Sequence, residues 1–82
     1  MTTKRNYYRY KLNQWRNIVY YGITNDPERR ENEHISEGKN FSKMRIVGPV
    51  VKKGTAINWE EEKIDNYKGN HRGRRPKYND LG

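Results

Sequence analysis

The chain has 82 residues, a formal charge of +8 and no cysteine. This length leaves room for one domain with a thin core, and the lack of cysteine excludes disulfides, thiolate metal sites and cysteine nucleophiles. The excess of positive charge indicates a polyanionic partner, with nucleic acid favoured over a membrane surface, and we expect no membrane partner and no small-molecule cofactor.

The first half of the chain is predicted to form a hairpin followed by a helix. Residues 6–12 and 17–23 are rich in tyrosine and β-branched side chains and are separated by a turn over residues 13–16, which predicts two antiparallel strands. Asp26 is suited to cap a helix and Gly38 to end one. A helix is therefore predicted over residues 27–37.

The second half is predicted to add one strand and one helix. The apolar residues of 44–51 indicate a third strand, which should end near its Gly-Pro pair because proline cannot donate to a central ladder. Thr55 can cap a second helix over residues 56–67, and Gly69 can end it. The order β-β-α-β-α predicts an α+β domain in which a small, mostly antiparallel three-stranded sheet is flanked by helices.

One carboxylate of the second predicted helix is out of place. On a helical wheel Glu60 falls near the centre of a broad apolar face made by Ala56, Ile57, Trp59, Ile64 and Tyr67. Desolvating a carboxylate is costly, so Glu60 is expected either to pair with an arginine or to bind a metal ion. Its neighbours Glu61 and Glu62 point elsewhere and are expected to be solvated.

The first predicted helix carries an arginine and a histidine one turn apart. Arg30 and His34 share one face, and a guanidinium beside an imidazole suits a phosphate better than a core. Taken alone the pair is a weak signal, because a histidine on a helix surface commonly has no function and Arg29 is a second candidate for an anion contact.

The hairpin tyrosines allow both structural and functional interpretations. Tyr8 and Tyr10 share one face of the first strand, whereas Tyr20 and Tyr21 point to opposite faces of the second. Cross-strand aromatic pairing accounts for most tyrosines in such positions, so each of them considered alone is expected to be structural.

The joint spacing of these residues resembles the GIY-YIG nuclease superfamily from Asn6 to Asn79. Where that family has Gly-Ile-Tyr and Tyr-Ile-Gly, this chain has Asn6-Tyr7-Tyr8 and, after eleven intervening residues, Tyr20-Tyr21-Gly22. The family's helical arginine and its His or Tyr fall on Arg30 and His34, and its metal-binding glutamate falls on Glu60, between Ala56 and Ile64. The family's terminal Pro-x-Tyr-Asn is present as Pro76-Lys77-Tyr78-Asn79, and the first glycine of the family pattern is absent.

The resemblance implies a metal-dependent endonuclease mechanism. Tyr8 would take a proton from water with His34 as its neighbour, although the choice of Tyr8 over Tyr10 is left open by the sequence. Arg30 would hold the phosphate oxygens, and Tyr20 would orient the phosphate. One Mg²⁺ or Mn²⁺ on Glu60 would stabilise the leaving group. The resemblance also carries an active-site role to Asn79, which would fix the hydrogen-bond network or Tyr8 itself.

Basic residues outside these motifs are expected to contact the DNA backbone. Residues 70–79 are rich in arginine, glycine and proline and are predicted to be irregular. Phosphate contacts would give affinity without sequence preference. The predicted contact residues are Lys52, Lys53, Arg72, Arg74, Arg75 and Lys77.

Three alternatives follow from the same sequence. The chain could be a non-catalytic nucleic-acid-binding module, as the absent glycine suggests, or an RNase on the same scaffold. The stretches around Thr24 and Arg74 also resemble GIY-YIG domains at the ends of bacterial polymorphic toxins. That resemblance implies delivery as part of a longer toxin, action in the cytoplasm of a target cell, and an acidic immunity protein as partner.

Overall fold

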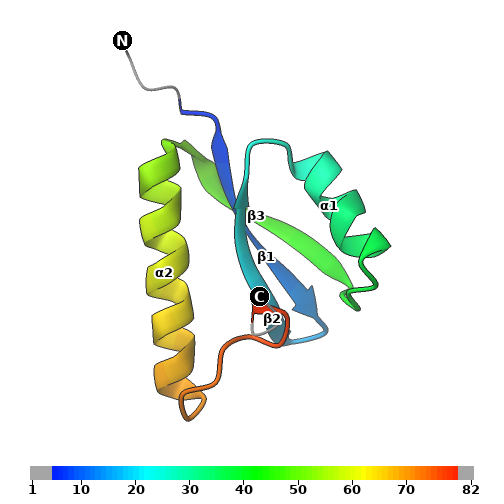
Figure 1. The fold of residues 1–82 in the computed structure, drawn as a ribbon, viewed down its shortest axis with the longest axis vertical. Helices are drawn as coiled ribbons and strands as arrows, with labels where there is room; N and C mark the ends of the chain where they lie inside the picture. The colour runs from blue at the N-terminus through cyan, green and yellow to red at the C-terminus, as the bar shows by residue number, and fades with distance from the viewer. Residues whose placement is uncertain (1–4, 80–82) are drawn as a thin grey trace.

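The structure, a computed structural model, describes residues 5–79 and consists of a three-stranded sheet with a helix on each side (Figure 1). The elements follow in the order β1 (Tyr7–Gln14), β2 (Asn17–Thr24), α1 (Pro27–Ser36), β3 (Lys43–Val51) and α2 (Lys53–Asn70). The strand order is β2-β1-β3, and β1 pairs antiparallel with both neighbours. The predicted α+β class and the order β-β-α-β-α are confirmed.

The two helices cover opposite faces of the sheet. Tyr20 and Tyr21 are adjacent in β2, so their side chains point to opposite faces. The ring of Tyr20 contacts His34 of α1 at a centroid distance of 4.8 Å, and the ring of Tyr21 contacts Trp59 of α2 at 5.8 Å. The face of β2 that each helix covers is therefore set by these two aromatic contacts.

Local capping signals predicted α1 well and α2 less well. The Asp26 side chain accepts a hydrogen bond from the Arg29 amide at 3.2 Å, as expected of an N-cap. The prediction that α2 starts after Thr55 and stops at Gly69 is wrong, because the helix begins three residues earlier, at Lys53, and continues to Asn70. These extra residues at the start of α2 are exposed, and the helix begins without a side-chain cap. Within the described residues, neither helix has the length and apolar content to cross a membrane.

The third strand continues where it was expected to stop. β3 runs through Gly48 and Pro49 to Val51, so the prediction that it ends at this pair is wrong. Its register with β1 shifts between Tyr7 and Arg9, which marks a bulge, and Gly48 has a positive φ of 67°. Proline is tolerated at bulges and on edge strands, and β3 is an edge strand.

A thin core lies where β1 and β2 pair. Tyr10, Leu12 and Val19 are its buried members. Four partly buried aromatic or apolar side chains pack against them, namely Tyr20, Phe41, Met44 and Tyr78. The core residues thus come from the hairpin, from β3 and the connection before it, and from the C-terminal segment. Packing in the core therefore joins elements that are far apart in the sequence.

The C-terminal segment is irregular, as predicted, but it covers the outer edge of β2. Pro76 is fully buried, and the Tyr78 amide donates to the Val19 carbonyl at 2.8 Å. The Asn79 side chain accepts from the Tyr21 amide at 2.8 Å and donates to the Tyr21 carbonyl at 3.0 Å. An amide side chain thereby pairs with the edge of the sheet as a neighbouring strand would.

Candidate active site

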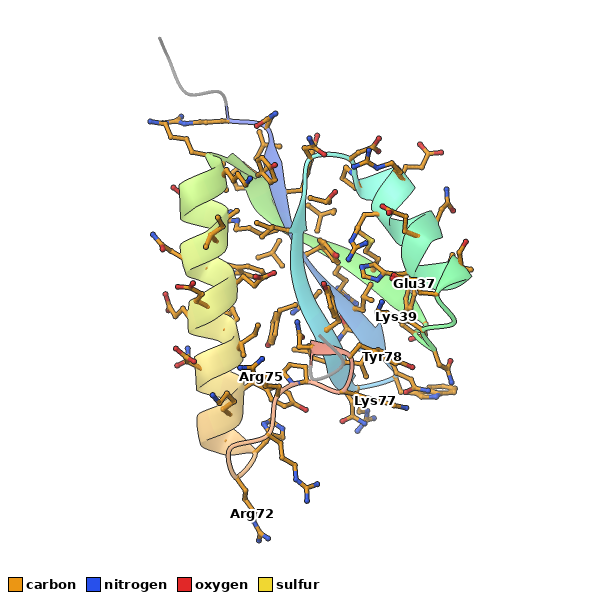
Figure 2. The ribbon with its side chains drawn as sticks, in the orientation of Figure 1. Glu37, Lys39, Arg72, Arg75, Lys77 and Tyr78 are labelled. Carbon is orange, nitrogen blue, oxygen red and sulfur yellow. The ribbon has the colours of Figure 1, made fainter. Side chains whose placement is uncertain are left out.

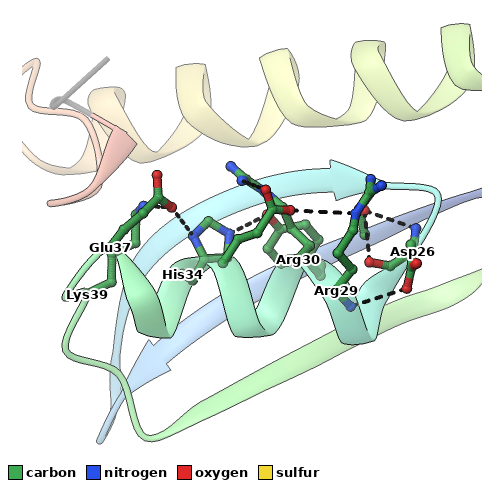
Figure 3. A network of polar contacts seen from close by, with 9 residues as sticks. Asp26, Arg29, Arg30, His34, Glu37 and Lys39 are labelled. Atoms are coloured by element: carbon green, nitrogen blue, oxygen red, sulfur yellow. Dashed lines mark hydrogen bonds and ion pairs between the residues drawn. The ribbon is translucent and has the colours of Figure 1, made fainter.

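The centre of the candidate site is a buried hydrogen bond between a tyrosine and a histidine. The Tyr10 hydroxyl lies 2.7 Å from Nε2 of His34, and both side chains are fully buried. Tyr10 is on β1 and His34 is on α1, where it lies between Arg30 and Glu37 along the helix (Figure 3). Two polar groups removed from water must satisfy each other, so this bond fixes α1 on the sheet.

Tyr20 and Arg30 complete the group, which we call the tyrosine–histidine cluster: Tyr10, Tyr20, Arg30 and His34. The Tyr20 ring stacks on Tyr10 with centroids 5.9 Å apart. Burial alone would lower the pKa of Arg30, but side-chain hydrogen bonding to Tyr20 and Tyr10 outweighs it and raises this pKa. The cluster therefore combines two phenols, an imidazole and a permanent positive charge.

Gly22 makes room for this arrangement. It lies opposite Tyr10 in the β1–β2 register, and a methyl group at its Cα would stand 2.5 Å from the Tyr10 hydroxyl oxygen and 2.5 Å from the Tyr20 ring. Such distances are well inside van der Waals contact. The glycine of the Tyr20-Tyr21-Gly22 triplet is thus required by close approach of the Tyr10 side chain to the backbone.

The protonation states of the buried pair follow from its surroundings. Burial, with the nearby charges of Arg30 and Lys39, lowers the pKa of His34 to about 4. Burial and the neighbouring Tyr20 raise the pKa of Tyr10. At neutral pH the cluster therefore holds an uncharged imidazole and a protonated phenol.

The neighbours of His34 favour one tautomer. Its Nδ1 is buried, has no hydrogen-bond partner among the described residues, and lies 3.7 Å from a carboxylate oxygen of Glu37. A proton on Nδ1 would point at this carboxylate, and Nε2 would then accept from the Tyr10 hydroxyl. We assign this tautomer because it places the only imidazole proton beside the negative charge.

The structure corrects the expected partner of His34. Tyr8 lies on the same face of β1 as Tyr10, is partly buried and stands opposite Thr24. Nε2 of His34 bonds to Tyr10, and no hydrogen bond joins His34 to Tyr8 among the described residues, so the structure replaces the expected neighbour Tyr8 with Tyr10. Register explains the difference, since Tyr10 is the tyrosine opposite Gly22. The sequence spacing left this choice open.

Asn79 also has a different neighbour from the one expected. Its side chain accepts one hydrogen bond from the Tyr21 backbone and donates one to it, and no hydrogen bond to Tyr8 is found among the described residues. It holds the strand at the residue next to Tyr20, so it acts on the cluster through β2. Tyr78, one residue earlier, reaches the connection between α1 and β3, where its hydroxyl accepts from the Asn40 amide at 2.7 Å.

Glu60 is half-buried on the sheet-facing side of α2. Burial, and then the charge of Glu61, raises the pKa of Glu60. It makes no ion pair within residues 5–79, so the alternative of a pairing arginine is not observed, whereas Glu61 and Glu62 are exposed as predicted. Because α2 and α1 cover opposite faces of β2, the structure does not bring Glu60 into the tyrosine–histidine cluster.

Glu60 also stands apart from other metal-binding side chains. No group of three or more acidic or histidine side chains that could hold a metal ion is found in the described part of the chain. Among the described residues, a metal ion at Glu60 would therefore have at most two acidic or histidine ligands, with water completing its coordination, which is a ligand set that Mg²⁺ accepts.

The six predicted DNA-contact residues are all exposed but form two groups. Lys52 and Lys53 lie at the start of α2, whereas the other four follow its end. A helix of 18 residues is about 27 Å long, so the groups are separated by roughly that distance. Figure 2 shows Arg72 pointing away from the body of the protein, below the end of α2.

Comparisons with known proteins give one partial match. Over 42 residues the chain is 45% identical to a UPF0213 protein of Vibrio campbellii (strain ATCC BAA-1116). The match covers 51% of this chain and 39% of the relative, so the chain spans about two-fifths of that protein's length. No family model matches the chain, and no solved structure matches it.

The close approach at Gly22 gives a stability prediction. Gly22→Ala should lower the free energy of unfolding by about 1–3 kcal/mol, because the new methyl group displaces the rings of Tyr10 and Tyr20. Urea denaturation measures the change. Gly54→Ala is the control: it lies in α2 with nothing within 4 Å of the added carbon, so stability should stay level or rise slightly. Equal effects of the two substitutions would contradict this account.

The buried imidazole gives a pH prediction. The folded pKa of His34 is about 4 and the ordinary value is 6.5, so between these values the unfolded chain binds a proton that the folded one excludes. The free energy of unfolding should therefore decrease as pH falls through this window, by up to about 3 kcal/mol from this residue. Urea denaturation at several pH values should show a shallower decrease for His34→Gln, and an unchanged one for exposed His71→Gln. Parallel curves for wild type and His34→Gln would refute the assignment.

Proposed function

We propose that this protein is an endonuclease that hydrolyses phosphodiester bonds of DNA with little sequence preference. The observation that carries the proposal is the buried Tyr10–His34 hydrogen bond with the Arg30 guanidinium beside it. These groups can accept a proton and bind a phosphate, which are two requirements of phosphodiester hydrolysis. The resemblance of the motif spacing to GIY-YIG nucleases and the charge of +8 support the same conclusion.

Tyr10 is the residue that we propose for water activation. A phenol with a raised pKa is a poor base unless its own proton can leave as it receives another. In the assigned tautomer the Tyr10 proton already points at Nε2 of His34. Tyr10 is fully buried in the free protein, so the proposed step requires that substrate binding admits water to the phenol oxygen. As this water gives a proton to the phenol oxygen, the phenol proton passes to His34, and the Glu37 carboxylate near Nδ1 stabilises the resulting imidazolium.

Arg30 and Tyr20 are proposed to hold the phosphate. Arg30 is partly exposed and lies one helical turn before His34, so its guanidinium can bind two non-bridging oxygens while water lies near Tyr10. The Tyr20 hydroxyl, on the ring stacked against Tyr10, would orient the phosphate. The ion pair between Arg30 and Glu33 is long, at 3.8 Å, and both groups reach solvent, so an incoming phosphate can replace it.

Glu60 is kept as the proposed ligand of Mg²⁺ or Mn²⁺. A half-buried carboxylate with no counter-charge in the described chain fits a hydrated divalent cation. Such an ion supplies charge neutralisation at the leaving 3′ oxygen. Since Glu60 lies on the far face of β2 from Arg30, we derive no step of the reaction through it.

The proposal extends to the biological setting suggested by the toxin resemblance. A DNase delivered as part of a longer toxin would act in the cytoplasm of the target cell, and an acidic immunity protein would complement its charge of +8. An RNase on this scaffold would use the same phosphate contacts. Parallel digestion of plasmid, single-stranded DNA and total RNA separates the two substrates.

A matched pair of tyrosine substitutions tests the mechanism. Tyr10→Phe removes the hydroxyl bonded to His34 and should reduce plasmid nicking by about 100-fold or more, the usual contribution of general base catalysis. Tyr8→Phe removes a hydroxyl from the same face of the same strand and should leave nicking near the wild-type rate. The reverse ranking would return the base to Tyr8. DNA binding with no nicking by the wild type in Mg²⁺ would instead establish a non-catalytic binding module.

A second matched pair tests the metal ligand. Glu60→Gln should abolish Mg²⁺-dependent nicking or move it to much higher Mg²⁺ concentrations, because a neutral amide binds the ion far more weakly than a carboxylate. Exposed Glu62→Gln makes the same change of charge on the same helix and should have little effect. Nicking is measured over a Mg²⁺ titration with an EDTA control, and a wild-type titration curve for Glu60→Gln would exclude Glu60 as the ligand.

A further inference from the structure

The tip of the β1–β2 hairpin presents a tryptophan to solvent. Trp15 is 86% exposed, whereas the other tryptophan, Trp59, is partly buried against Tyr21. Burying an aromatic side chain is strongly favourable, and every other aromatic ring of this protein is buried or partly buried. The exposed indole of Trp15 is therefore a candidate contact for a binding partner.

The backbone holds this side chain in place. Trp15 has a φ of 59°, a left-handed conformation that is uncommon for a bulky residue. Its amide donates to the Ser42 hydroxyl at 3.2 Å, and that hydroxyl donates to the Asn13 carbonyl at 3.0 Å. The Ser42 amide also donates to the Asn13 carbonyl, at 2.8 Å. The connection between α1 and β3 thus supports an unfavourable turn geometry, which is typical of positions kept for function.

The surroundings of the indole are basic. Trp15 shares a shallow hollow with Arg16 and Lys43, and the remaining lining residues, Asn17 and Ser42, are uncharged. An aromatic ring in one hollow with two cations matches the chemistry of a single nucleic-acid strand, whose bases can stack on the ring while its phosphates contact the charges. The same chemistry disfavours a basic or purely apolar protein partner.

We infer that Trp15 is a stacking site for an unpaired nucleic-acid base, with Arg16 and Lys43 binding the adjoining phosphates. In a duplex the faces of each base are covered by its neighbours, so an indole can stack only on a base that is unpaired or terminal. Trp15 follows the end of β1 and is five residues from Tyr10, which corresponds to at most about 17 Å of extended chain. The site would therefore direct the enzyme toward single-stranded or distorted DNA near the scissile phosphate. The inference rests on the proposed function only in taking nucleic acid as the partner.

A binding titration without Mg²⁺ tests the stacking site independently of cleavage. In the variant Trp59→Phe, Trp15 is the sole tryptophan, and its fluorescence should be quenched by an oligothymidylate but not by an abasic oligomer of equal length and charge. In the otherwise wild-type chain, Trp15→Ala should weaken oligothymidylate binding about 5- to 100-fold, the range for loss of one base–aromatic stack. Trp15→Phe should recover most of the affinity, and abasic binding should be unaffected by either change.

The controls separate base stacking from general apolar contact and from membrane binding. Ile35→Ala removes another exposed apolar side chain and should leave both affinities unchanged. An equal loss of oligothymidylate and abasic binding in Trp15→Ala, or no loss of either, would overturn the inference. So would a blue shift of Trp15 fluorescence on anionic phospholipid vesicles without quenching by oligothymidylate, since the indole would then be a membrane contact. Fluorescence anisotropy of labelled oligomers gives the affinities even if Trp59→Phe is poorly folded.

Discussion

The hydrogen bond between Tyr10 and His34 is the interaction on which the rest of the site depends. Helix α1 has few apolar side chains, so its position on the sheet cannot come from hydrophobic burial alone. A buried polar pair supplies that position, because each group would otherwise lose water without compensation. The same bond orients the helix so that Arg30 faces the two phenols. One contact thus secures the fold and assembles the groups that we propose for catalysis.

The C-terminal segment supports the tyrosine–histidine cluster by binding the outer edge of β2. An edge strand exposes unpaired backbone groups, and Asn79 and the Tyr78 amide satisfy those of Val19 and Tyr21. The Tyr78 ring also joins the core that contains Tyr10. A segment with the composition of a flexible basic tail is therefore part of the structure, and its exposed cations are held at a fixed place beside the sheet.

Local signals in the sequence were sufficient for the fold class and for part of the site. The start of α1 follows from Asp26, whose carboxylate caps the helix in the structure. Helical spacing placed Arg30 and His34 on one face, and the structure brings both to the tyrosines. The helical wheel also selected Glu60 as a desolvated carboxylate, which its half-buried position confirms. Each of these inferences needs only neighbours within a few residues along the chain.

The tertiary structure decided the features that depend on how distant segments align. Tyr8 and Tyr10 share a face and a side-chain type, and only the β1–β2 register, which sets Tyr10 opposite Gly22, shows which one meets His34. The start of α2 at Lys53 and the attachment of Asn79 to β2 were likewise invisible in sequence. By itself the sequence determined element types and helix faces, because these follow from local capping and periodicity. Strand register and the partners of buried polar groups were settled only by packing between segments far apart in the chain.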